Sequence, residues 1–404
     1  MKKQRGRMIP KNKFILVGIL IFLFIISLAC QKEKTGWQGT VEEENGVKVV
    51  NNPAEPMYGE LVLELEEDLA IGSLEDENYS FYRIGGIAVD SQGNIFVVDS
   101  GNQRIQKYDK DGNYLQTIGR KGQGPGEFMR PFNILLDEQD NIYLMEIRRL
   151  HFFDPQGNFV KSFVPPTFIM GFTVGSDGSI IAYGFISTEK AQNFGVMILD
   201  SEGKITKTIA EYPGMSMVSR KGAMFTFSHP YKPQLAFSPI GKKGAVYGYG
   251  SEYKLIVTDF SGEAFLIIKK DEPSQSITHR EKDKIIDDVL EDTADEEEGR
   301  WPRDVVEEGA DFPDHRPFFN GAGADDLGRI YVSKQKSVFD ESQETEFDIF
   351  GPDGYYLYRT KLSFMPELIK DGYLYHRTYS EETGVYKVIR YRIKNWEKIK
   401  AGIK

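Results

Sequence analysis

Cysteine is almost absent from this chain, since its 404 residues include only Cys30. A single cysteine excludes an intramolecular disulfide framework, so the fold must be held together by its core. Histidine is also sparse, and none of the five residues pairs with another at metal-ligand spacing. The sequence has no Gly-x-Ser-x-Gly element, and the glycine-rich segment 122–128 lacks the Lys and Ser or Thr of a phosphate-binding loop. Motifs for a serine hydrolase or a P-loop enzyme are therefore missing.

Long hydrophobic runs are confined to the N-terminus. Residues 2–13 carry six Lys or Arg side chains and no acidic one, and an apolar run follows from Phe14 to Ile26. This run is shorter than the roughly 20 residues of a membrane-spanning helix, so the layout predicts a signal peptide. Without residues 1–29 the formal net charge falls from -11 to -17. Such an acidic chain is not expected to bind nucleic acid.

The segment Ser27-Leu28-Ala29-Cys30 resembles the lipobox of bacterial lipoproteins, with Ser27 and Leu28 in the reverse of the usual order. The resemblance implies cleavage before Cys30, attachment of lipid to its thiol, and a membrane contact made through that lipid. An uncleaved anchor and a plain secretory signal are the alternatives. We expect a signal peptide over 1–29, a flexible tether over 30–60, and a place in the cell envelope. Gln31 after the cysteine favours the outer membrane if the host is Gram-negative.

Repeats dominate residues 61–404. Residues 85–119 contain four short runs of alternating apolar residues separated by Gly, Asp and Asn turns, and residues 131–163 repeat this order. Four further units follow with drift. Turn residues recur at two places in the units, as Gly93, Asp140, Gly178, Gly244, Gly328 and Gly372, and as Gly112, Gly157, Gly203, Gly262 and Gly354. Tight turns need positive φ, so each unit predicts antiparallel strands and the six units predict an all-β, six-bladed propeller.

The sixth unit lacks a fourth strand. The alternating stretch Leu61–Leu65, ahead of the first unit, is expected to complete the last blade and close the ring. The units resemble NHL repeats and related bacterial six-bladed propellers over residues 61–396, most clearly at Asp90–Val97, Asn102–Gln106 and Gly122–Phe128. The resemblance implies the fold.

Long connections all belong to one face of the predicted disc. The longest insertion, residues 270–318, contains Thr278-His279-Arg280-Glu281, a capping-box pattern, before an apolar spacing that predicts a short helix over 284–290. We expect this helix to pack on the propeller as a partial lid. Because binding sites are usually built on loops carried by a rigid scaffold, this loop-rich face is the predicted site.

Six residues on that face are candidates for ligand contact: Arg83, Arg148, His229, Tyr231, His315 and Arg316. Arginines suit an anionic group, while salt bridges between blades and ordinary loop positions are the alternatives. No catalytic residue, metal ligand or cofactor is assigned. We expect a non-catalytic binding or scaffolding lipoprotein that engages a peptide, glycan or protein partner. The alternative is a metal-dependent propeller enzyme of the lactonase or lyase type, with channel ligands such as Asn133, His229, Asn320 and Asp325.

Overall fold

The computed structural model describes residues 37–399, except 188–191, 216, 221–222, 227 and 293–300. Cys30 and the expected signal peptide lie outside the described residues. The chain from Gln38 onward forms one compact unit. Within the described residues, no helix has the length and apolar character needed to cross a membrane.

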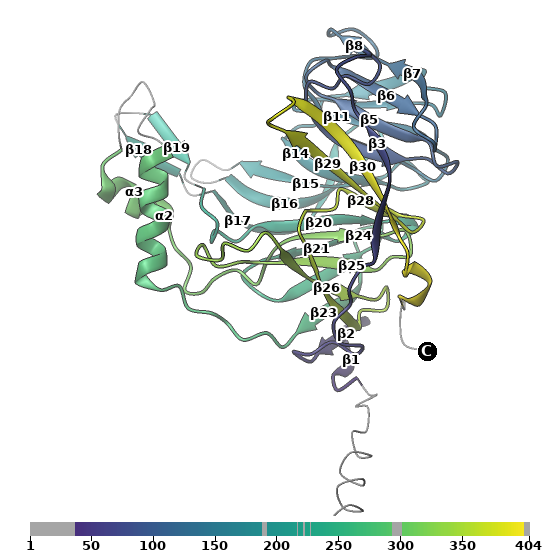
Figure 1. The fold of residues 1–404 in the computed structure, drawn as a ribbon. Helices are drawn as coiled ribbons and strands as arrows, with labels where there is room; N and C mark the ends of the chain where they lie inside the picture. The colour runs from purple at the N-terminus through teal and green to yellow at the C-terminus, as the bar shows by residue number, and fades with distance from the viewer. Residues whose placement is uncertain are drawn as a thin grey trace, which may run out of the picture. The chain divides into compact units, whose positions relative to one another are not determined.

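Six blades of four antiparallel strands each form a propeller, as predicted, and one of these blades is part of a larger six-stranded sheet (Figure 1). Blade one contains β4 (Ile84–Val89), β5 (Ile95–Asp99), β6 (Arg104–Tyr108) and β7 (Tyr114–Ile118). Blade two contains β10 (Pro131–Leu136), β11 (Ile142–Glu146), β12 (Leu150–Phe153) and β13 (Phe159–Phe163). Blade three contains β14 (Ile169–Val174), β15 (Ile180–Ser187), β16 (Gln192–Leu199) and β17 (Ile205–Met215).

The remaining blades follow the same plan. Blade four contains β20 (Leu235–Ile240), β21 (Gly244–Tyr249), β22 (Lys254–Thr258) and β23 (Ala264–Lys270). Blade five contains β24 (Phe319–Ala324), β25 (Ile330–Lys334), β26 (Thr345–Phe350) and β27 (Tyr356–Leu362). Blade six contains β28 (Leu368–Lys370), β29 (Tyr373–Ser380), β30 (Val385–Ile393) and, from the N-terminal side, β3 (Leu65–Ile71).

Many turns on the short-loop face combine an aspartate with a glycine of positive φ. In blade one, Asp90 accepts hydrogen bonds from the backbone N–H groups of Gln92 and Asn94 and from the Asn94 side chain. Gly93 has φ +84°, which only glycine adopts without strain. The repeated turn residues in the sequence are therefore structural, because each one holds a hairpin in shape.

The N-terminal strand closes the ring, although it starts later than predicted. β3 pairs antiparallel with β30, from Leu65 opposite Ile393 to Ile71 opposite Val388. The expected strand at 61–65 is instead an extended stretch beside blade five, where the Leu61 N–H donates to the Arg359 carbonyl. The closure buries Ile71 and Val388 in one apolar cluster with blade-one residues. The sixth blade thus has no missing strand.

Part of the expected tether is folded. β1 (Thr40–Glu44) and β2 (Val47–Asn52) form a hairpin, and β2 pairs in parallel with β23, so that blade four has six strands. Asn52 is buried and bonds the carbonyls of Lys269 and Gly354 and the N–H of Tyr356. The tether prediction is therefore wrong for residues 40–52, which join blades four and five.

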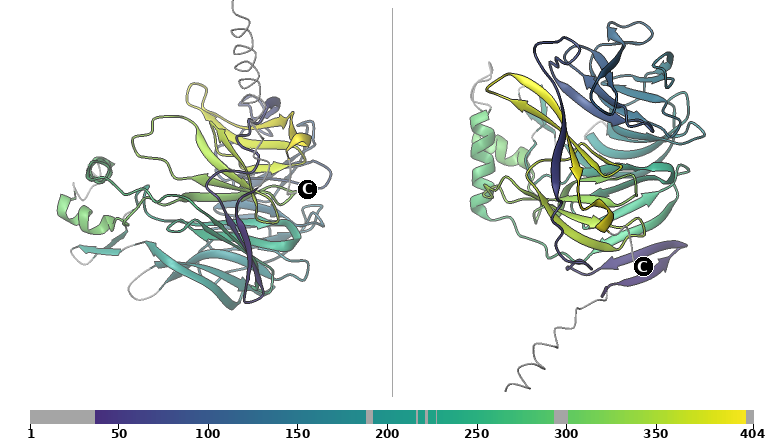
Figure 2. Two further views of the ribbon diagram at one scale, coloured as in Figure 1. Left: turned by 90° about the horizontal axis from the view of Figure 1, so that it is seen from below. Right: turned by 45° about the vertical axis from the view of Figure 1, so that its right-hand side comes forward.

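The long insertion contains two helices instead of one. α2 (His279–Asp292) begins with the predicted capping box, in which Thr278 and Glu281 exchange hydrogen bonds. Its residues Ile286 and Leu290 pack with Trp301 and with Val306 of α3 (Arg303–Ala310). This cluster includes none of the described blade residues, so the helix packs mainly on its own partner and the lid prediction is not supported. Figure 2 shows the two helices beside each other at the side of the blades.

Two short sheets complete the described structure. β8 (Arg120–Lys121) and β9 (Glu127–Phe128) form a parallel pair within the connection from blade one to blade two. β18 (Met217–Arg220) and β19 (Ala223–Thr226) form an antiparallel pair between blades three and four. Both sheets lie in connections of the loop-rich face, which confirms that the elaboration is on one side.

Candidate functional site

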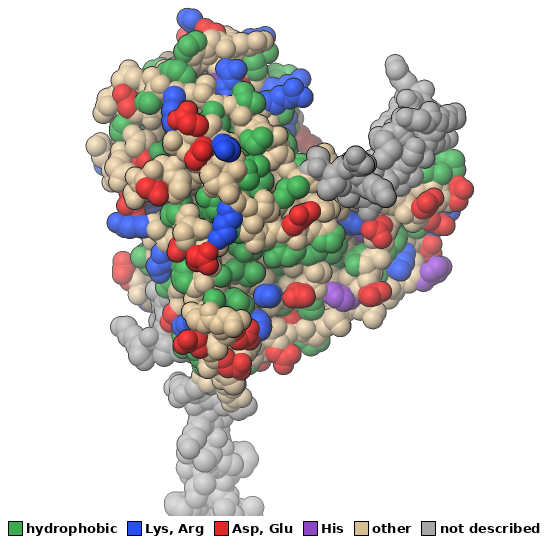
Figure 3. Space-filling model, turned by 180° about the vertical axis from the view of Figure 1, so that it is seen from behind, with side chains coloured by type: hydrophobic (Ala, Val, Ile, Leu, Met, Phe, Trp, Pro, Cys, Tyr) green, Lys and Arg blue, Asp and Glu red, His purple; other side chains and the backbone are tan. Residues whose placement is uncertain are grey.

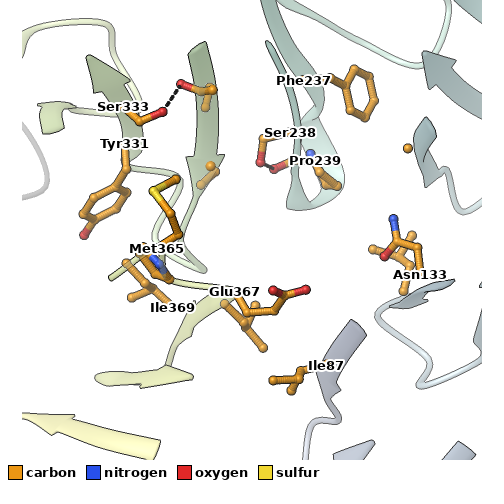
Figure 4. Close-up of a pocket in the computed structure, with 18 of the residues that line it drawn as sticks. Ile87, Asn133, Phe237, Ser238, Pro239, Tyr331, Ser333, Met365, Glu367 and Ile369 are labelled. Carbon is orange, nitrogen blue, oxygen red and sulfur yellow. Dashed lines mark hydrogen bonds between the residues drawn. The ribbon is translucent and has the colours of Figure 1, made fainter. Parts of the chain in front are cut away.

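The first strands of all six blades surround a central channel that holds a cavity of about 430 Å³ (Figure 4). Its walls are mostly apolar, and the blade-five strand contributes only Gly and Ala, from Gly321 to Ala324. At Gly323 a Cβ atom would meet nothing within 4 Å, so this wall leaves the channel open. Volume and apolar walls are in the range typical of small-molecule pockets.

Glu367 is the only charged residue among the described residues that line the channel. Its carboxylate points into the cavity from blade six, and Asn133 lies on the facing wall (Figure 4). Burial raises the pKa of Glu367, and the nearby Arg377 partly offsets this effect. The Arg377 Nε lies 3.2 Å from a Glu367 oxygen, and its Nη1 donates to the carbonyls of Ile84 and Gly85. Arg377 therefore ties blade six to blade one at the channel mouth.

The four residues suggested as metal ligands do not come together. Asn133 lines the channel, but His229 is buried beside the insertion. Asn320 accepts a hydrogen bond from Ser333, and Asp325 is buried in an ion pair with Arg329. Among the described residues, no group of three or more His, Cys, Asp or Glu side chains is placed to hold a metal ion. The channel therefore offers no metal site built from that set.

Tyr231 and Arg316 hold the insertion to the propeller instead of facing solvent. Both contact Glu281 at the start of α2: the Tyr231 hydroxyl donates to its carboxylate, and the Arg316 Nη2 lies 2.7 Å from it. Ser337 and Thr278 also donate to Glu281. Burial alone would raise the pKa of Glu281, but these hydrogen bonds outweigh it and lower the pKa to about 2. We call this set of five residues the Glu281 hub.

The two candidate histidines also have structural contacts. His229 is buried, its Nε2 lies 2.7 Å from the Ala310 carbonyl oxygen, and its ring packs on Phe312. Burial lowers the pKa of His229, which favours the neutral ring. His315 contacts the Arg316 carbonyl and the Phe318 ring. Four of the six candidates therefore support the insertion, and none of these four is aimed at a ligand.

The remaining two candidates, Arg83 and Arg148, line two adjoining hollows over blades one and two. The hollows have volumes of about 840 and about 760 Å³ and share Met129, Arg130 and Ile147. Together they contain five arginines, which are Arg83, Arg130, Arg148, Arg149 and Arg377. We call the two hollows the arginine groove.

The side chains of three of these arginines are unpaired among the described residues. Within the described residues, Arg83, Arg130 and Arg148 are exposed and make no side-chain hydrogen bond or ion pair. By contrast, most of the described arginines elsewhere face carboxylates, as Arg390 faces Asp68 and Arg392 faces Glu66. The face in Figure 3 shows basic and acidic side chains interspersed in this way. The groove is therefore a local positive region on an acidic chain.

The one carboxylate that lines the groove is already occupied. Glu146 accepts hydrogen bonds from the backbone N–H groups of Met129 and Arg130, and its other oxygen lies 3.0 Å from the Nε2 of buried His151. Burial would raise the pKa of Glu146, but these bonds outweigh it and lower the pKa. Glu146 thus holds the loop that carries Arg130, and its single negative charge leaves the five lining arginines in excess.

Tight glycine contacts fix the other side of the groove. A Cβ on Gly101 would lie 2.2 Å from the Tyr82 ring, and one on Gly85 would lie 2.2 Å from the Ser100 hydroxyl oxygen. The Ser100 hydroxyl in turn donates to the Pro131 carbonyl, which joins blade one to blade two. The groove is therefore built on a close-packed and preformed surface.

A family model described as "Domain of unknown function (DUF4934)" matches residues 74–280, just over half of the chain. The chain belongs to this family. The match contains blades one to four and four of the five groove arginines, with only Arg377 outside it. The groove is thus largely a feature of the DUF4934 segment.

Similarity to other proteins is more distant. The chain is 26% identical to the Drosophila melanogaster protein brain tumor over 132 residues, which are 31% of this chain and 12% of that protein. A protein of Bacteroides fragilis superposes with a TM-score of 0.50 at 13% identity, covering 85% of this chain and all of that one. A DUF4221 family member from Bacteroides vulgatus gives 0.50 at 12% identity, covering 82% and 98%. These likenesses to structures concern the fold alone.

Arg130 was not among the residues predicted from the sequence. It immediately precedes β10, the first strand of blade two, just as Arg83 immediately precedes β4 of blade one. Aligning the two repeats at their first strands would have paired these arginines. The repeat alignment would therefore have identified Arg130 as a candidate from the sequence alone.

Proposed function

We propose that this DUF4934 protein is a non-catalytic binding lipoprotein of the cell envelope, held by lipid on Cys30, whose loop-rich face engages a partner. The arginine groove supports this proposal: three arginines without a salt bridge among the described residues face solvent beside exposed apolar side chains. The one described carboxylate that lines the groove already accepts hydrogen bonds from backbone N–H groups. Convergent cationic groups in a preformed hollow favour an anionic ligand group.

The anchor rests on the sequence around Cys30. The test is metabolic labelling with a palmitate analogue, comparing the full-length chain with Cys30→Ser. Labelling of the wild type and its loss in Cys30→Ser, with release of the variant from the membrane fraction, is expected. Equal labelling of both chains would contradict a lipid on Cys30.

The binding face is tested with a photo-crosslinking amino acid at Tyr82, whose side chain is 73% exposed in the groove. The matched control places it at Lys242, which is 82% exposed in the short turn after β20 on the opposite face. We expect a partner adduct from position 82 that Arg83→Glu with Arg148→Glu removes. Adducts from position 242 alone, or adducts that ignore the two arginines, would contradict the proposed face.

A further inference from the structure

Resting on the proposed function, we propose that the arginine groove binds an extended acidic peptide segment of a protein partner. Carboxylates of the segment pair with Arg83, Arg130 and Arg148, and its apolar side chains cover Met129 and Ile147.

The residue types that line the groove are those of a protein interface. The described lining residues include five arginines and no lysine, together with Tyr82, Phe132, Phe168 and Met129. Aromatic residues, methionine and arginine are enriched at the centre of protein interfaces, where lysine and acidic residues are depleted. The planar guanidinium fork also matches a carboxylate with two parallel hydrogen bonds, which a lysine ammonium does not.

Exposed apolar side chains alternate with the arginines. Met129, Ile147 and Val164 are 44%, 40% and 61% exposed, and all three line the groove. Phe168 is 36% exposed at the blade-three end, where its ring packs between Phe132 and Phe185. An anionic sugar chain supplies carboxylates but no aliphatic or aromatic side chains to cover these residues. A peptide supplies both, so the mixed surface favours a peptide over an acidic glycan.

The arrangement favours an extended segment. Arg83, Arg130 and Phe168 each stand immediately before the first strand of blades one, two and three. Equivalent positions in neighbouring blades repeat around the channel mouth, so the three side chains follow one another at the spacing of the blades. The two hollows share Arg130 and the ridge of Met129 and Ile147. A ligand that fills both hollows must therefore cross this ridge.

Charge selects the ligand as well as attracting it. The chain carries a formal net charge of -11, so an acidic segment is repelled by most of the surface and attracted only where positive groups gather. Electrostatic complementarity of this kind sets orientation and specificity, and salt weakens it. Binding at the groove should therefore fall as ionic strength rises.

The experiment measures fluorescence anisotropy of labelled hexapeptides with residues 31–404, which contain the compact unit from Gln38 onward. An array permutes Glu and Asp with Leu, Phe and Gly, and each peptide has counterparts with Gln or Lys in place of the acidic residues. A linear hexamer of a uronic acid is the glycan probe. We expect the best acidic-apolar peptides to bind about tenfold or more tightly than their Gln counterparts, and less tightly at high salt.

The variants are Arg83→Gln, Arg130→Gln and Arg148→Gln, alone and together. Each single change is expected to weaken peptide binding severalfold and the triple change at least about tenfold. The control Arg392→Gln removes the same charge from a 55% exposed site on β30, paired with Glu66, and should change affinity less than about twofold. Unchanged melting temperatures of all variants show that they are folded.

The outcomes separate this inference from the proposed function. Arginine-dependent binding of the uronate hexamer without a preference for acidic-apolar peptides would overturn the peptide ligand and leave an anion-binding face. Absence of arginine-dependent binding of every anionic probe would overturn both. Equal binding of Gln and Glu peptides would show that the arginines do not recognise carboxylates.

Discussion

The Glu281 hub and the arginine groove use the same residue type in opposite ways. In the hub, Arg316 is 20% exposed and lies against a carboxylate that is itself 1% exposed. In the groove, Arg83, Arg130 and Arg148 are exposed and face no carboxylate among the described residues. In the hub, the arginine charge is paired and holds the insertion in place. In the groove, the arginine charges are unpaired and can bind an anionic ligand. A cluster of arginines becomes a candidate ligand site only where the fold has not already neutralised it.

The largest loss of stability is expected when the carboxylate of the Glu281 hub is removed. Glu281→Ala leaves the Tyr231 hydroxyl and the Arg316 guanidinium without their buried partner. We expect the free energy of unfolding to fall by about 4 kcal/mol, or the insertion to become protease-sensitive before the blades unfold. Urea unfolding and limited proteolysis measure this. The control Glu308→Ala, exposed on α3, should stay within about 0.5 kcal/mol of the wild type, and equal behaviour of both variants would contradict the hub.

Acid should weaken the same contact. The pKa of Glu281 is lowered from 4.5 to about 2, so the unfolded chain takes up this proton first. The stabilisation is therefore complete above pH 4.5 and is lost as the pH falls toward 2, by about 3 kcal/mol in total. As the pH is lowered across this range, the unfolding free energy should fall more steeply for the wild type than for Glu281→Gln. Parallel pH profiles would show that Glu281 is not held as its carboxylate.

A smaller loss of stability is expected when Glu146, the buried carboxylate beneath the groove, is changed. Glu146→Gln weakens the contacts to the N–H groups of Met129 and Arg130 and to His151. We expect a loss of about 1.5 kcal/mol in unfolding free energy, together with weaker binding of the probes used for the groove. Glu138→Gln in the β10–β11 turn on the opposite face is the control. Weaker folding with unchanged binding would mean that Glu146 does not position Arg130.

The smallest effect on stability is expected at the groove arginines themselves. The triple change of Arg83, Arg130 and Arg148 to Gln removes no side-chain hydrogen bond or ion pair made within the described residues. The unfolding free energy should therefore change by less than about 0.5 kcal/mol, while binding of an anionic probe is lost. A large loss of stability would show that the groove arginines, like Arg316 in the hub, stabilise the fold.

The fold was predictable where the evidence was local. The turns at Gly93 and Gly112 and the capping box at Thr278 and Glu281 are short-range patterns, and the structure confirms the elements that they predict. The β1–β2 hairpin was not predicted, because β2 is paired with β23, more than 200 residues later. Its charged strand Thr40–Glu44 gave no sign of that partner.

The site was harder to predict than the fold for the same reason. Tyr231 and Arg316 read as exposed loop residues, yet both are satisfied by Glu281, which is distant from each of them in the sequence. Which polar side chains remain available depends on such pairings, and spacing within a repeat does not reveal them. The equivalent places of Arg83 and Arg130 were visible in the sequence, but their lack of partners was not.

The hairpin that widens blade four also has a mechanical consequence. A pull on the chain ahead of Thr40 reaches β1 and β2 before it reaches β3, the strand that closes the ring. The five register pairs of β2 with β23, together with buried Asn52, share that load with blades four and five. The hairpin therefore takes up the applied force first, and the pairing of β3 with β30 that closes the ring bears less of it.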